Sequence, residues 1–227
     1  MEPAGEIRHH AQMTRQRFGF RWLLATAAVL ALLIGVPAIR DRALRAAGWA
    51  LVAEDPLARA DVIAIASDSY GSGVLEAADL FHAQIAPRVL VFSLPVSPVA
   101  REFARRGVQN PDSASQQLER LHALGVVSAE RLTPPVAGTH DEARVLASWC
   151  HVEHCRIVVF VSTPDHSRRT RRILRRVFKA DAVRVIVRYP PYSEFDPNSW
   201  WRSRSGTRTE IVELEKLLVE LLGHPLG

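Results

Sequence analysis

The chain has 227 residues, of which 48% are hydrophobic and 23% are charged, proportions that exclude a disordered or fibrous protein. Its net charge of +5 comes from 29 Lys and Arg residues against 24 Asp and Glu residues. No stretch has the pattern of a nucleic-acid-binding module, so we expect no nucleic acid partner. The length suits one α/β domain with an appendage.

The appendage is at the N-terminus. Residues 1–21 are a polar tail, and residues 22–39 (WLLATAAVLALLIGVPAI) contain no charge. At about 1.5 Å per residue this run reaches roughly 27 Å, close to the hydrocarbon thickness of a bilayer. We therefore expect one transmembrane helix at 22–39. A cleaved signal peptide is the alternative, although the apolar run is long for one. Arginines flank the run on both sides, so charge does not set its orientation.

The remaining chain alternates strand and helix patterns. Residues 40–57 are expected to be a stalk with a helical stretch at 41–52, and residues 58–222 an α/β domain. We expect strands at 61–66, 88–93, 131–132, 157–161 and 182–187, and helices at 74–84, 98–106, 113–125, 139–149, 166–178 and 208–222. This alternation implies parallel pairing, and so a three-layer Rossmann-like sandwich with a mostly parallel sheet.

Apolar spacing predicts which helix faces are buried. In the helix at 113–125 the inward residues are expected to be Leu118, Leu121 and Leu124. In the last helix, the predicted inward stripe consists of Ile211, Leu214, Leu217, Leu218 and Leu221.

The sequence is organised around residues 157–172 (IVVFVSTPDHSRRTRR), an unbroken apolar strand followed by a turn and a basic helix. In open α/β sheets, ligands bind outside the carboxyl ends of the strands, where a helix N-terminus favours anions. His166 is a candidate general acid or base, because its ordinary pKa is near neutrality. Arg169 could clamp a phosphate or carboxylate with two donors, and Asp165 could cap the helix.

Other polar residues are expected at the same sheet edge. Thr139 with Glu142 three residues later has the pattern of a capping box. Glu142 is a candidate catalytic residue or merely a cap, and Asp141 or Glu142 could orient His166 or Arg169. The expected ligand-binding residues are Ser67, Asp68, Ser93, Thr139, Asp141, Ser162, Thr163, Arg168 and Arg169.

Two cysteines flank a short polar turn at residues 150–155 (CHVEHC). A disulfide between Cys150 and Cys155 is favoured if the domain is in an oxidising compartment. Two buried thiols are the second possibility. A metal site is the least favoured, because structural zinc ligands usually come from two separated pairs, so no metal is expected.

Four stretches together resemble the YdcF/SanA/ElyC-like family. They are residues 55–65, the turn into a helix at 138–143 (GTHDEA), the turn at 161–169 (VSTPDHSRR) and residues 200–210 (WWRSRSGTRTE). The resemblance covers roughly residues 53–222. The first strand departs from the family pattern, because Ser67, Asp68, Ser69 and Tyr70 follow it where the family has a glycine-rich turn.

The resemblance implies a Rossmann-like domain behind one membrane anchor, placed on the periplasmic side of the bacterial cytoplasmic membrane. The family is linked to cell-envelope assembly and barrier function, and some members are thought to bind S-adenosylmethionine.

We expect an envelope protein that binds a phosphorylated or nucleotide-like molecule, or a lipid-linked precursor. The alternatives are a transferase or hydrolase with His166 as general base, and a non-catalytic scaffold. No cofactor motif is present, so the cofactor is unknown and enzyme status is open.

Overall fold

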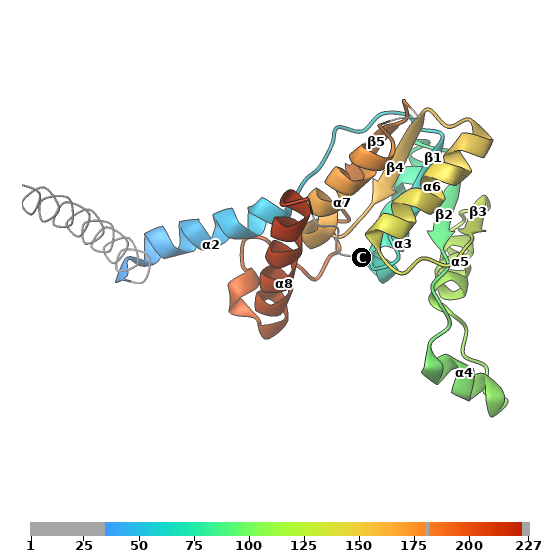
Figure 1. Cartoon of the computed structure of the whole chain (residues 1–227), viewed down its shortest axis with the longest axis horizontal. Helices are drawn as coiled ribbons and strands as arrows, with labels where there is room; N and C mark the ends of the chain where they lie inside the picture. The colour runs from blue at the N-terminus through green and yellow to red at the C-terminus, as the bar shows by residue number, and fades with distance from the viewer. Residues whose placement is uncertain (1–34, 180–181, 224–227) are drawn as a thin grey trace, which may run out of the picture. The chain divides into compact units, whose positions relative to one another are not determined.

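The computed structural model describes residues 35–179 and 182–223 (Figure 1). The chain divides into two compact units between Ala47 and Gly48, and α2 (Pro37–Leu51) crosses this division. The transmembrane helix expected at 22–39 falls mainly outside the described residues. Among the helices that are described, none has the length and hydropathy to span a bilayer.

A five-stranded parallel sheet forms the centre of the second unit. Its spatial order is β3-β2-β1-β4-β5, and every neighbouring pair is parallel. The strands are β1 (Val62–Ile65), β2 (Val89–Phe92), β3 (Ala129–Leu132), β4 (Ile157–Val161) and β5 (Arg184–Arg188). The α/β class and the parallel sheet predicted from the sequence are confirmed. The strand order reverses between β1 and β4, which makes that position the topological switch point.

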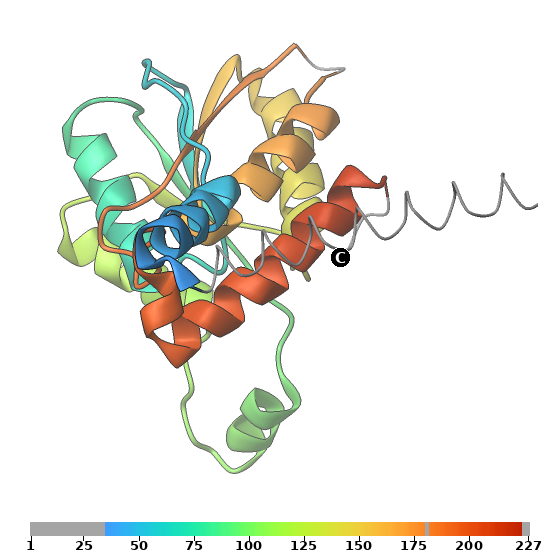
Figure 2. The same cartoon turned by 90° about the vertical axis from the view of Figure 1, so that its left-hand side faces the viewer.

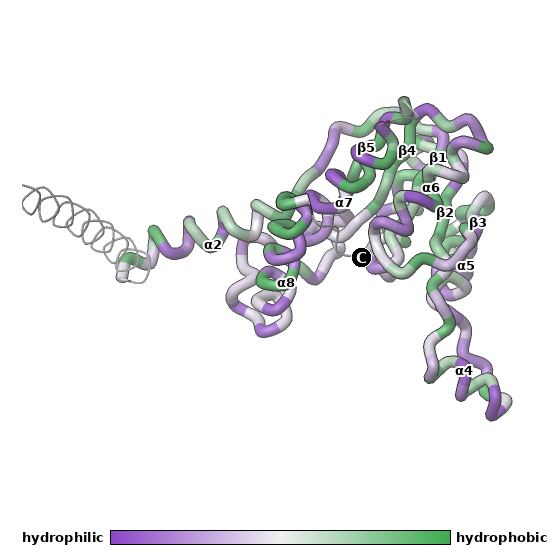
Figure 3. Tube along the Cα trace, viewed as in Figure 1, coloured by the Kyte–Doolittle hydropathy of each residue, from purple (hydrophilic) through white to green (hydrophobic). Residues whose placement is uncertain are grey.

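Helices cover both faces of the sheet. The helices of this unit are α3 (Tyr70–His82), α4 (Pro98–Arg105), α5 (Ser113–Ala123), α6 (Thr139–Glu153), α7 (Pro164–Val177) and α8 (Arg204–Leu221), with a short 3-10 turn η1 (Trp200–Arg202) before α8. Because side chains alternate along a strand, Ile63 and Ile65 pack with α3 and α5, whereas Val62 and Ala64 pack with α6 and α7. The three central strands β2, β1 and β4 contain only hydrophobic residues and carry the hydrophobic colour in Figure 3.

The helix α4 is separate from these layers. It lies on the connection from β2 to α5 and projects away from the sheet in both views (Figures 1 and 2). None of its residues is buried, and Phe103 and Val99 are exposed.

The face that α8 buries differs from the predicted one. Glu210, Glu213, Leu217 and Glu220 are buried, whereas Ile211, Leu218 and Leu221 of the expected apolar stripe are each more than half exposed. Leu124 of α5, also expected inward, is exposed.

Ion pairs account for the buried face of α8. Glu220 contacts His140 and Arg176, and Glu213 contacts His166, Arg169 and Lys216. These paired charges let Glu213 and Glu220 be buried. The predicted apolar stripe is inward only in part, because Leu217 is buried and Leu214 packs against the same cluster.

The α3 helix begins at Tyr70, four residues before the predicted start, so Gly71 and Gly73 lie in the helix rather than in the preceding turn. A Cβ atom on Gly73 would lie 2.5 Å from the Ser69 Cβ and 2.8 Å from the Ile65 Cγ2. Gly73 thus allows α3 to pack closely against the end of β1.

Replacing Gly73→Ala should destabilise the fold by about 1–3 kcal/mol, because the added methyl group overpacks the contact between α3 and β1. The matched control is Gly71→Ala in the same helix turn, where a Cβ meets nothing closer than 3.8 Å. The control should be neutral or slightly stabilising, since alanine is the better helix former. Urea unfolding of the two full-length variants measures the difference, and equal stabilities would refute the close packing.

Candidate functional site

The candidate site lies at the carboxyl edge of the sheet, on both sides of the switch point. Ser67 and Asp68 follow β1, and Thr163 to His166 follow β4. Thr163 precedes the first residue of α7 and Pro164 occupies its first turn, where a missing N–H costs nothing. The expected capping role of Asp165 is wrong, because no side chain caps this helix.

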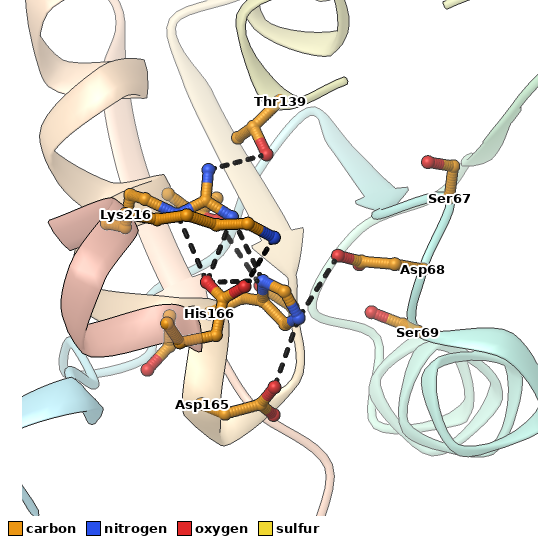
Figure 4. A network of polar contacts seen from close by, with 12 residues as sticks. Ser67, Asp68, Ser69, Thr139, Asp165, His166 and Lys216 are labelled. Atoms are coloured by element: carbon orange, nitrogen blue, oxygen red, sulfur yellow. Dashed lines mark hydrogen bonds and ion pairs between the residues drawn. The ribbon is translucent and has the colours of Figure 1, made fainter. Parts of the chain in front are cut away.

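The His166 ring is held between carboxylates (Figure 4). Its Nε2 lies 3.0 Å from Asp165 Oδ2 and 3.6 Å from Asp68 Oδ2, and its Nδ1 lies 3.0 Å from Glu213 Oε2. Both ring nitrogens therefore face carboxylate oxygens, and the Arg169 Nη2 also lies 3.0 Å from Nδ1. A ring that donates to carboxylates from both nitrogens carries a positive charge.

This environment sets the charge of His166. Burial by itself lowers the pKa of the imidazole, but hydrogen bonds to Asp165 and Glu213 and the charge of Asp68 outweigh it and raise the pKa to about 10. Burial likewise acts to raise the pKa of Glu213, yet the His166 and Arg169 charges lower it to about 2. A raised pKa favours the imidazolium form of His166 at neutral pH, and an imidazolium has no lone pair for a general base.

The Arg169 guanidinium is buried and engaged by the protein. Its Nε and Nη2 donate to Glu213 Oε2 at 3.2 and 3.1 Å, and its Nη1 donates to Thr139 Oγ1 at 3.3 Å. Arg168 faces elsewhere, because its Nη2 donates to the carbonyls of Trp49 and Val52. Arg169 is thus held by internal partners while it lines the cavity edge, and the two-pronged clamp on a ligand stays a prediction.

Glu142 is buried at the same edge but does not form a capping box. The residue that precedes α6 is Gly138, and no side chain caps the helix. Instead, Glu142 Oε1 accepts a hydrogen bond from the Ser67 amide at 2.8 Å. Burial, together with the charge of Asp68, raises the pKa of Glu142 to about 7. Glu142 rather than His166 is thus the group that can exchange a proton near neutral pH.

Two neighbouring cavities open at this edge. The first, which we call the basic cavity, has a volume of about 500 Å³ and is lined by Gly138, Thr139, Glu142, Arg169 and Lys216. The second, the tyrosine cavity, has a volume of about 480 Å³ and is lined by residues that include Tyr70, Thr163, Asp165 and Tyr192. Asp68 and His166 line both cavities, so these two side chains form the boundary between them.

Sequence reasoning missed Glu213 and Lys216, both on α8. The Lys216 Nζ lies 2.7 Å from Glu213 Oε1, and its side chain is 38% exposed. Two features of the sequence could have found them. Only two of the 29 basic residues are lysines, and the acidic residues of α8 recur at helical spacing, at 210, 213 and 220.

Glu210 is a further buried carboxyl on α8. Within the described chain neither of its oxygens has a hydrogen-bond partner. Burial and the charge of Asp165 raise its pKa to about 7. A carboxyl in such surroundings is held in its neutral form over most of the acidic pH range.

Three expected ligand-binding residues lie at this edge but line neither cavity. Ser93 and Ser162 are buried, and Ser162 Oγ contacts Thr170 Oγ1. Asp141 accepts a hydrogen bond from the Ala137 amide and pairs with Arg144. Glu213 and Asp165, rather than Asp141 or Glu142, orient His166.

Cys150 and Cys155 are both buried, and the structure has them as thiols without a disulfide between them. Their oxidation state in the cell stays a prediction. Among the described residues, no group of three or more His, Cys, Asp or Glu side chains is arranged to hold a metal ion.

Comparisons with known proteins add little. No family model matches the chain, and no curated protein matches it. Among solved structures, a universal stress protein in complex with cAMP is similar over 60% of this chain and 100% of its own, with 13% identity and a TM-score of 0.35. A likeness this distant identifies no ligand for this chain.

Glu142 should make stability fall as pH rises. Because its pKa is about 7 in the folded chain and near 4.5 when exposed, the folded chain binds more protons between these values. Stability is therefore lost as pH rises through that window, by roughly 3 kcal/mol in total. Glu142→Gln should lack this loss. The free energy of unfolding of the variant, relative to that of the wild type, should therefore be higher at pH 8 than at pH 4.5.

The matched control is Glu119→Gln, at an exposed position of α5. It should follow the wild type at every pH. Any contribution of Glu210 is present in all three proteins and cancels. Parallel pH profiles of the wild type and Glu142→Gln would rule out a raised pKa at Glu142.

Proposed function

We propose that the chain binds a small ligand with an anionic group, phosphorylated or nucleotide-like, in the basic cavity. One observation carries the proposal: at the switch point of the sheet, a cavity of about 500 Å³ brings Lys216, His166 and the N-terminus of α6 together. Switch points are where open α/β sheets bind ligands.

The charges around the basic cavity suit an anion. Lys216 contacts Glu213 at one oxygen and is exposed enough to turn another N–H to a ligand. Gly138 and Thr139 line the cavity where α6 starts, and a helix N-terminus carries partial positive charge. Glu142 opposes an anion when it is ionised, but its proton removes that charge and supplies a donor. Lys216 takes the role that the sequence assigned to Arg169.

We also propose that the chain is a YdcF-like protein of the bacterial envelope, held by residues 22–39 in the cytoplasmic membrane with its α/β domain on the periplasmic side. The apolar run and the four sequence stretches support this. In that setting the ligand could be a phosphorylated lipid-linked precursor. A non-catalytic scaffold and an S-adenosylmethionine-binding protein remain the alternatives.

A second candidate function is a hydrolase or transferase. It is favoured by the pKa of Glu142, about 7, in the same cavity as the imidazolium of His166. Glu142 would exchange the proton, and His166 would stabilise negative charge rather than act as a base. Hydrolysis of 4-nitrophenyl phosphate by the wild type, lost in Glu142→Gln and retained in Glu119→Gln, would support this candidate.

Lys216→Gln should weaken the binding of inorganic phosphate about tenfold or more, because a charge-assisted hydrogen bond to the anion is lost. Titration calorimetry on the purified full chain measures this effect. The control is Lys179→Gln, which removes the other lysine at an exposed position beyond the end of α7. Equal affinities of the two variants would overturn the proposed anion site.

The membrane proposal predicts that the full chain stays with the membrane fraction after alkaline carbonate extraction. Leu30→Arg, in the middle of the apolar run, should release it. An arginine at the centre of a spanning helix costs roughly 2.5–3.5 kcal/mol on insertion scales. Val99→Arg, on the exposed helix α4, is the control and should remain in the membrane fraction. Wild-type protein in the carbonate supernatant would contradict the anchor.

A further inference from the structure

The tyrosine cavity has a chemistry different from that of the basic cavity beside it. Carboxylates of Asp68, Asp165 and Glu194 line it, and within it His166 alone carries a positive charge. An anionic group would be repelled here. The tyrosine cavity therefore needs another kind of ligand group.

Two tyrosines offer exposed rings to this cavity. The side chains of Tyr70 and Tyr192 are 65% and 55% exposed, although both residues line a concave site. Tyr70 has a φ of 43°, a left-handed conformation that a bulky residue rarely adopts. The Tyr192 hydroxyl donates to Asp79 Oδ2 at 3.3 Å, which holds its ring beside α3. Such rings stack on the flat face of another ring.

In the described part of the chain, two side-chain oxygens of residues that line the cavity have no hydrogen-bond partner. Among the described residues, Asp68 Oδ1 and Thr163 Oγ1 are buried without a hydrogen-bond partner, and both residues line the cavity. A buried polar atom without a partner is costly and calls for an explanation. A ligand hydroxyl can donate to either atom once its side chain turns toward the cavity.

We propose that the tyrosine cavity is a subsite for a ring with neighbouring hydroxyl groups, and that this ring is joined to the anionic group in the basic cavity. The proposal deepens the proposed function and rests on it for the anionic half. Because Asp68 and His166 line both cavities, the cavities are adjacent, and a molecule that extends over these two side chains would occupy both. The shared chemistry is a phosphorylated sugar ring, which both a hexose phosphate and a nucleotide contain.

The experiment compares five probes on the purified full chain by titration calorimetry. The probes are inorganic phosphate, glucose 1-phosphate, adenosine monophosphate, glucose and adenosine, in a detergent without a sugar headgroup. We expect at least one phosphorylated probe to bind about tenfold more tightly than inorganic phosphate, because the ring adds stacking and hydrogen bonds. Glucose 1-phosphate binding better indicates a hexose, and adenosine monophosphate binding better indicates a nucleotide.

Two variants test the ring subsite. Tyr70→Asn removes the ring with a residue that tolerates a positive φ, and Thr163→Val removes the buried hydroxyl without a change of shape. In both variants the phosphorylated probe should bind at most about twofold more tightly than inorganic phosphate. The affinity for inorganic phosphate itself should not change. Retained phosphate binding also shows that the variants fold. Phe103→Ser, which removes an exposed ring on α4, should leave the tighter binding of the phosphorylated probe unchanged.

The outcomes separate this inference from the proposed function. If inorganic phosphate binds through Lys216 but neither ring improves on it, the ring subsite is overturned and the anion site stands. If inorganic phosphate does not bind, the proposed function fails. In that case glucose or adenosine binding that depends on Tyr70 would support the ring subsite, and no binding of either would overturn it as well.

Discussion

A buried imidazolium between carboxylates holds the carboxyl edge of this sheet together. Glu213 comes from α8, Asp165 from α7 and Asp68 from the turn after β1, and all three meet at the His166 ring. Burial alone would remove the proton from the ring, and the carboxylates retain it. The positive charge of this ring, together with Arg169 and Lys216 beside Glu213, thus offsets the repulsion of three acidic side chains from separate elements.

That constraint determines which groups remain for a ligand. His166 and Arg169 are occupied by internal partners, so they organise the site rather than grip a ligand in this structure. Lys216 and Glu142 are different. The lysine is partly exposed, and Glu142 titrates near neutrality in the same cavity. A bound anion would therefore compete with Glu213 for the Lys216 ammonium group. Glu213 would still be paired with His166 and Arg169.

The sequence predicted much of the fold and one side of the site. Apolar runs marked four of the strands, β3 was predicted only as a brief strand at 131–132, and the run at 157–161 correctly placed His166 at a strand end. Its partner Glu213 was not predictable in the same way. The last helix has both an apolar stripe and an acidic stripe at helical spacing, and hydropathy favours the apolar one. The positions of its basic partners in space, which the sequence does not give, explain why Glu213 and Glu220 are buried. Lys216 was missed for the same reason.

The helix that carries His166 also receives the chain where it enters the domain. Arg168 donates to the carbonyls of Trp49 and Val52, and Ser167 Oγ accepts from the Ala53 amide. These bonds fasten the entering segment directly to the first turns of α7. A tension applied through the residues before Gly48 would be transmitted to that turn before it reached any strand. The charged start of α7, which carries His166, is therefore the first part of the sheet domain that such a tension would reach.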